Sequence, residues 1–140
     1  MTFRIVTTVT LVLAVAAAVV GCGLFGRDNE IDKRAVRPGE PKTSPSGLYT
    51  AYAEDGEPQN TVKTLVDVIR DQDGNEVYRD DAAYSTRHGV LFTWLTTEPH
   101  QLWILSSDVG TFYVSPDDHG TWNKQHATEV PQEIKELRGY

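Results

Sequence analysis

The sequence predicts a small all-β fold, an antiparallel β-meander that forms a sandwich or a partly closed barrel, followed by a short C-terminal helix. Residues 47–126 consist of short segments rich in aromatic and β-branched residues, which favour strands. Turn-forming residues bound these segments. No segment before residue 130 shows the apolar periodicity of a helix. We therefore assign residues 47–126 to one β domain.

Six segments are predicted to be strands because they combine apolar, aromatic and β-branched residues. They are Leu48–Glu54, Val62–Arg70, Glu76–Arg79, Val90–Thr96, Gln101–Ser106 and Thr111–Ser115. Asp73-Gly74 predicts a hairpin turn, since glycine adopts positive φ without steric cost. The stretch Ser107–Gly110 predicts a second turn.

The last three predicted strands can be paired through two four-residue loops, 97–100 and 107–110. One face of the meander would then carry six apolar residues: Phe92, Trp94, Trp103, Leu105, Phe112 and Val114. The opposite face would carry four more: Leu95, Leu102, Ile104 and Tyr113. Because a single open sheet would leave one of these faces in water, a sandwich or a curled barrel is favoured.

Residues 127–140 predict a tail with a short helix. Pro131 suits the first helical position, and Glu133 favours the positive end of the helix dipole. One side of this helix would carry three apolar residues: Val130, Ile134 and Leu137. We expect the helix to pack on the edge of the sheet, since two turns are not stable alone.

Residues 22–46 predict a flexible, disordered tether in front of the domain. Mixed charges fill the stretch Arg27–Arg34, and Pro38, Pro41 and Pro45 interrupt regular structure.

Residues 1–21 have the pattern of a secretory signal. Arg4 precedes an uncharged run, Ile5–Val20, which would extend about 24 Å as a helix, short of the roughly 30 Å core of a bilayer. A small residue, Gly21, ends the run.

Val19-Val20-Gly21-Cys22 resembles the lipobox of bacterial lipoproteins. The resemblance implies cleavage between Gly21 and Cys22, a diacylglycerol group on the Cys22 sulfur, and a further acyl chain such as palmitate on the new amino group. It implies a cell-envelope location, with the domain held outside the cytoplasm on the plasma or outer membrane by the acyl chains. Cys22 is the only cysteine of the chain, so no internal disulfide can form.

The chain carries 13 Lys and Arg against 20 Asp and Glu, a net charge of −7. This balance argues against nucleic acid as a partner, because phosphate binding requires clustered cations. An acidic surface is also not attracted to anionic lipids, so membrane attachment is expected to depend on the acyl chains. No cofactor motif occurs, and no cofactor is predicted.

Two sequence patterns resemble known loops. Ser44–Tyr49 and Asp71–Gly74 are similar to turns of bacterial β-propeller blades, but the chain has no blade-length repeat. Asp71, Asp73 and Asn75 alternate as at the start of a calcium loop, yet the sixth-position glycine and twelfth-position glutamate are missing. Turns between strands explain both patterns, and no metal site is predicted there.

Histidines and aspartates offer a catalytic alternative. Asp117, Asp118, His119 and His126 lie close in sequence, but no Gly-x-Ser-x-Gly elbow or paired-histidine spacing occurs. We predict no catalytic residue, no metal ligand and no enzymatic activity, with a small hydrolase as the least favoured reading.

Three tryptophans, Trp94, Trp103 and Trp122, are either core residues or a binding surface. We expect a non-catalytic module that binds or shields an envelope protein or a peptidoglycan-related partner. One alternative is an inhibitor of a cationic muramidase, similar to periplasmic lysozyme inhibitors, although Ser46-Gly47-Leu48-Tyr49 is one residue shorter than their Ser-Gly-x-x-Tyr loop. Another is a structural subunit of an envelope complex.

Overall fold

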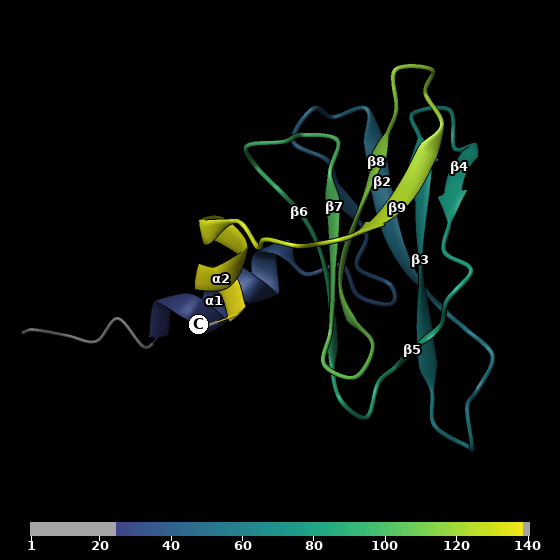
Figure 1. The fold of residues 1–140 in the computed structure, drawn as a ribbon, viewed down its shortest axis with the longest axis vertical. Helices are drawn as coiled ribbons and strands as arrows, with labels where there is room; N and C mark the ends of the chain where they lie inside the picture. Colours follow the sequence, from purple (N-terminus) through teal and green to yellow (C-terminus); the bar gives the residue numbers. More distant parts are fainter. Residues whose placement is uncertain (1–24, 139–140) are drawn as a thin grey trace, which may run out of the picture.

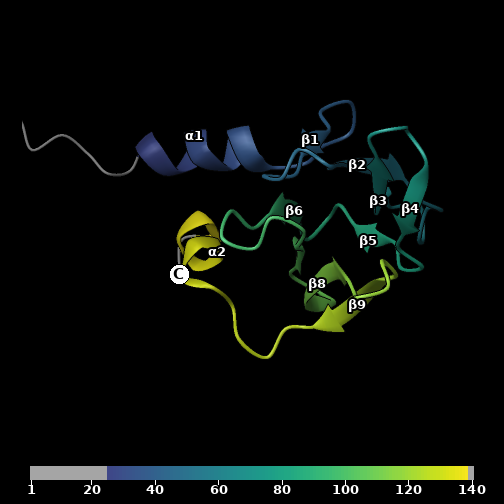
Figure 2. The same cartoon turned by 90° about the horizontal axis from the view of Figure 1, so that it is seen from above.

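The computed structural model describes residues 25–138, which form two antiparallel β-sheets packed face to face with two helices beside them (Figures 1 and 2). The predicted signal, its cleavage site and Cys22 lie outside the described residues. Within the described part, neither helix has the length and apolar character needed to cross a membrane.

The first sheet is built around a central strand, β3. Its strands follow the order β1 (Lys42–Thr43), β2 (Tyr49–Asp55), β3 (Thr64–Asp71) and β4 (Glu76–Arg79). A two-residue strand, β5 (Tyr84–Ser85), pairs with the opposite end of β3 from β4.

The second sheet is a four-stranded meander. It consists of β6 (Val90–Trp94), β7 (Leu102–Ser106), β8 (Gly110–Pro116) and β9 (Trp122–His126), in that order. Helix α1 (Phe25–Arg34) precedes the first sheet and α2 (Gln132–Arg138) follows the second. Both views show the helices together at the side of the molecule away from β4.

The sheets enclose one apolar core, and the helices cover a second. Between the sheets lie Ala51, Ile69, Tyr84, Phe92, Trp94, Leu102, Ile104 and Val114. On the outer face of the second sheet, Trp103 and Leu105 pack with Ile134 and Leu137 of α2. The predicted all-β fold with a short C-terminal helix is confirmed, as a sandwich and not a closed barrel.

The predicted register of the meander is wrong by one residue in both loops. Trp94 pairs with Leu102, not with Trp103, and Ser106 pairs with Gly110. The two errors cancel for β8, so Phe112 and Val114 do share the inner face with Trp94. Only β7 was assigned to the wrong face, and Trp103 and Leu105 point toward the helices.

Residues 25–46 contain more structure than the predicted tether. Val36 pairs with Phe92 beside the open edge of β6, and Ala35, Val36 and Ser44 are buried. Arg34 at the end of α1 forms an ion pair with Glu133 of α2. The described part of this segment therefore belongs to the folded domain.

Candidate binding site

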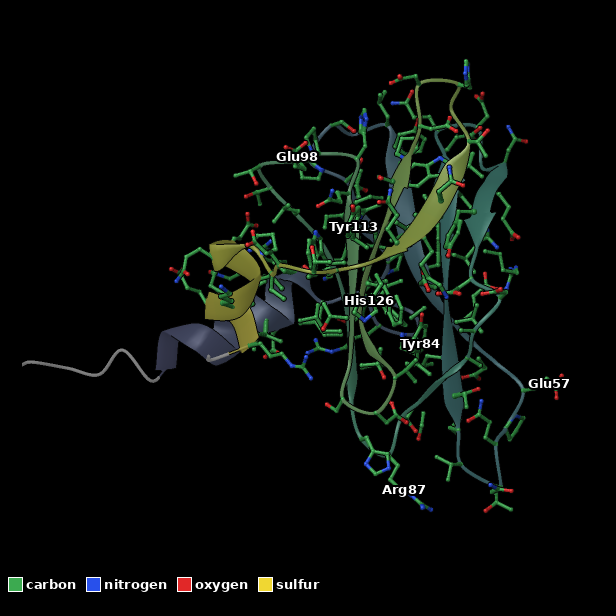
Figure 3. The ribbon with its side chains drawn as sticks, viewed as in Figure 1. Glu57, Tyr84, Arg87, Glu98, Tyr113 and His126 are labelled. Carbon is green, nitrogen blue, oxygen red and sulfur yellow. The ribbon has the colours of Figure 1, made fainter. Side chains whose placement is uncertain are left out.

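Edge strands β4 and β9 face each other across one side of the sandwich, which we call the seam. A pocket of about 400 Å³ lies there, lined by Tyr78, Arg79, Asp81, Trp122, Asn123 and Lys124, and we call it the seam pocket. Three of these residues come from β4 and the segment after it, and three from β9. Below the pocket, between the sheets, lie four polar side chains that we call the seam cluster: Asp67, Asp80, Tyr84 and Lys124 (Figure 3 shows Tyr84 between the sheets).

Asp80 is the centre of the seam cluster. It follows β4, and its side chain is fully buried. It accepts hydrogen bonds from the Tyr84 hydroxyl at 2.7 Å and from Lys124 Nζ at 2.5 Å. Burial disfavours its charged form, but the hydrogen bonds that it accepts outweigh burial and hold the pKa of Asp80 below the ordinary value. Asp80 is therefore an ionised carboxylate.

Asp67 differs from Asp80 in having no donor. It points inward from β3, where Ala53 is its partner on β2, and the residue is fully buried. Neither carboxyl oxygen has a hydrogen-bond partner among the described residues. Burial raises the pKa of Asp67 well above the ordinary value, and the negative charge of Asp80 raises it further. Folding thus favours the protonated form of Asp67 and the ionised form of Asp80.

Lys124 links this pair to the surface. It points inward from β9, contacts Asp81 at 3.3 Å as well as Asp80, and is about one quarter exposed. Burial opposes its charge, but the hydrogen bond to Asp80 and the nearby carboxylates raise the pKa of Lys124. An inward-pointing charge on an edge strand also discourages pairing with another chain.

The seam pocket presents hydrogen-bond donors that the described residues leave unused. The Tyr78 hydroxyl and the indole nitrogen of Trp122 take part in no hydrogen bond within residues 25–138. Burial, together with the negative charges of Asp80 and Asp81, raises the pKa of Tyr78, so its hydroxyl keeps its proton. Asp67 and Asp80 lie buried beneath the pocket, whereas Tyr78 and Trp122 line it.

The three tryptophans considered as a binding surface lie in different parts of the fold. Trp94 and Trp103 are buried on opposite faces of the second sheet, so they form no common surface. Trp122 packs edge-to-face against Tyr49 and Trp94, and it lines the seam pocket although only 8% of the residue is exposed. Of the three, Trp122 is the one that reaches the seam.

The suggested hydrolase residues are not brought together. Asp117 closes a turn by accepting hydrogen bonds from the backbone nitrogens of His119 and Thr121. His126 lies at the far end of β9, where its ring packs edge-to-face on Phe112 (Figure 3).

The calcium-like pattern is also a turn. Asp71 accepts hydrogen bonds from the backbone nitrogens of Asp73 and Asn75. Gly74 has φ of 84° in the same hairpin, as predicted for Asp73-Gly74. No group of three or more metal-binding side chains occurs between residues 25 and 138.

The seam cluster was not predicted from the sequence. A signal was present in β3, where Asp67 interrupts the apolar stretch Leu65–Ile69. A carboxylate in such a position requires either exposure or a partner, and its partners Asp80 and Lys124 are remote in sequence.

No family model, curated protein or solved structure matches the chain.

Proposed function

We propose that this protein is a lipid-anchored module of the cell envelope that binds a polar, acceptor-rich ligand in the seam pocket. The anchor rests on Val19-Val20-Gly21-Cys22, with Cys22 as the lipidated residue and Gly21 at the cleavage site. Helix α1 begins three residues after Cys22, so the anchor would join the helix side of the sandwich.

The observation that carries the binding role is the set of unused donors in the seam pocket. Tyr78 and Trp122 form two aromatic walls of the pocket, and no described residue uses the Tyr78 hydroxyl or the Trp122 indole nitrogen. Lys124 lines the same pocket and is partly exposed, with its ammonium group held by Asp80 and Asp81. Ligand sites commonly combine such walls with a few polar groups. A glycan supplies hydroxyl and carbonyl acceptors, so peptidoglycan is the first ligand to test in an envelope location.

The arrangement of the two sides agrees with this role. The seam lies at the side with β4, and the helices lie away from it (Figures 1 and 2). With the anchor at α1, the seam pocket would face away from the membrane toward the envelope space.

Attachment is tested by labelling cells with radioactive palmitate. The wild-type protein should incorporate label and Cys22→Ser should not. Label on the serine variant would contradict the anchor but would leave the pocket untouched.

Ligand binding is tested by co-sedimentation of the detergent-purified full chain with purified peptidoglycan. Tyr78→Phe removes one unused donor without changing the packing volume, and we expect about fivefold to tenfold weaker binding. Tyr52→Phe is the matched control, because Tyr52 lies on the other face of the first sheet beneath the Arg70 guanidinium. Equal binding by both variants would show that the ligand does not bind in the seam pocket. Failure of the wild-type protein to sediment with peptidoglycan would exclude peptidoglycan as the ligand.

A further inference from the structure

A second pocket lies where α1, β1 and the end of β6 meet, and its Trp94 wall packs against Trp122 of the seam pocket, with ring centroids 6.4 Å apart. It has a volume of about 360 Å³ and is bordered by Lys33, Arg34, Lys42, Thr43, Trp94 and Thr96, and we call it the basic pocket. Its lining contains three cationic side chains and no carboxylate, in a chain whose net charge is −7. Glu133 and Glu30 lie outside the lining and pair with Arg34 and Lys33, so the excess positive charge of the pocket comes from Lys42.

Two of the three cations already have partners. Arg34 is held by Glu133 and donates to the Trp94 carbonyl at 2.8 Å, so its guanidinium is fixed in position. Lys33 contacts Glu30 at 3.1 Å, but both side chains are more than half exposed. An exposed pair of this kind contributes little and can exchange its partner for a ligand.

Lys42 is the cation without a counter-charge. Its side chain takes part in no ion pair or hydrogen bond within residues 25–138. Its backbone is nevertheless fixed, because the Trp94 indole nitrogen donates to the Lys42 carbonyl at 2.8 Å. The fold therefore fixes the Lys42 backbone next to Trp94 and leaves the Lys42 ammonium group without a partner among the described residues.

We propose that the basic pocket binds the phosphate group of a phosphorylated ligand. Two flexible ammonium groups and one fixed guanidinium match the several oxygens of a phosphate, which accept charge-assisted hydrogen bonds. The Trp94 wall would contact the less polar part of the ligand. The phosphate belongs either to a soluble phosphate ester or to a lipid headgroup, and the same contacts serve both.

The proposal is tested by calorimetric titration of the detergent-purified full chain with inorganic phosphate at constant ionic strength. We expect saturable binding that Lys42→Ala weakens about tenfold and Lys42→Arg retains. The control is Lys135→Ala, which removes an equally unpaired cation from the exposed side of α2. Nuclear magnetic resonance gives a local readout, since the Trp94 indole proton signal should shift on binding and the Trp103 signal, from the opposite face of the second sheet, should not.

Two further probes identify the source of the phosphate. Lys42-dependent binding of monomeric dihexanoyl-phosphatidylglycerol would identify a headgroup, and binding of glycerol 3-phosphate alone would identify a soluble ester. Absence of saturable phosphate binding would overturn the proposal. Equal weakening by Lys42→Ala and Lys135→Ala would also overturn it, because it would show attraction to net charge and not to the pocket.

Discussion

Lys124 and Asp80 join the two sheets, with the ammonium nitrogen of one 2.5 Å from a carboxylate oxygen of the other. Lys124 belongs to β9 of the second sheet, whereas Asp80 follows β4 of the first. The contact closes the side of the sandwich where both sheets end. It also provides the only countercharge that reaches Asp80 within the part of the chain that the structure describes.

Lys124→Met should therefore destabilise the fold by about 3 kcal/mol, because it leaves the Asp80 carboxylate buried and unpaired. Urea unfolding measures the loss. Lys63→Met is the control, since the Lys63–Asp55 pair is 3.6 Å long with both side chains more than half exposed. That change should cost less than about 1 kcal/mol. Equal losses of unfolding free energy in the two variants would show that the Lys124–Asp80 pair contributes no more to stability than an exposed ion pair.

Asp67 should make the folded state more stable at low pH than at high pH. Burial raises the pKa of Asp67 above its ordinary value of 3.8, so folding favours its neutral form. That contribution is complete below pH 3.8 and is lost as the pH rises through the folded pKa. Asp67→Asn keeps the shape and removes the titration, so its stability should fall less than that of wild type as the pH rises from about 4 to about 8.

Asp80 should have the opposite effect, a loss of folding stability at low pH. Its lowered pKa means that its contribution is present above the ordinary value and is lost as the pH falls through the folded pKa. The Asp67→Asn variant should therefore keep this acid limb. Urea midpoints across the pH range check both limbs, and parallel curves for the two proteins would contradict the raised pKa of Asp67.

The strands could be predicted from the sequence, but their register could not. Each predicted strand overlaps an observed one, because aromatic and β-branched residues gather there. All five residues of β7 are buried, between the first sheet on one side and the helices on the other. A strand buried on both faces has no polar alternation to fix its register, so a loop one residue longer or shorter reverses its faces.

The elements that were missed are those with little apolar signal of their own. Helix α1 is dominated by charged residues, and β9 reads Trp-Asn-Lys-Gln-His. Their positions depend on partners far away in sequence, such as Glu133 for Arg34 and Asp80 for Lys124. The seam cluster was missed for the same reason, since only the fold brings Asp67 next to Asp80.

Glu133 should control the attachment of the helices. It accepts hydrogen bonds from the backbone nitrogen and the hydroxyl of Thr96, and it pairs with Arg34 of α1. Glu133→Gln keeps the side-chain size but removes the charge, which should cost about 1 to 2 kcal/mol. Hydrogen exchange should accelerate in α1 and α2 and stay unchanged in β2 and β3.

The control for this variant lies one turn further along α2. Glu136 contacts Gln132 of the same helix, and its side chain is exposed. Glu136→Gln should therefore leave exchange in α1 unchanged. Faster exchange throughout the sandwich in Glu133→Gln would show that the helices fold only together with the sheets.

Two glycines should respond differently to the same pair of substitutions. Gly74 has φ of 84° and open space around it, so Gly74→Ala should cost about 1 kcal/mol through backbone strain alone. Asparagine tolerates this conformation, and Gly74→Asn should recover most of the loss. At Gly56 an added Cβ would lie 2.7 Å from Thr64 Oγ1. Thr64 is buried and donates to the Glu57 carbonyl, so moving it away would break this hydrogen bond.

Gly56→Ala should accordingly cost about 1 to 3 kcal/mol through overpacking. Gly56→Asn should cost at least as much, because a larger side chain meets the same obstacle. Urea unfolding of the four variants separates backbone strain from overpacking. Replacing alanine by asparagine should raise the free energy of unfolding at position 74 and should not raise it at position 56. Recovery by asparagine at both positions would contradict the close approach of β2 and β3 at Gly56.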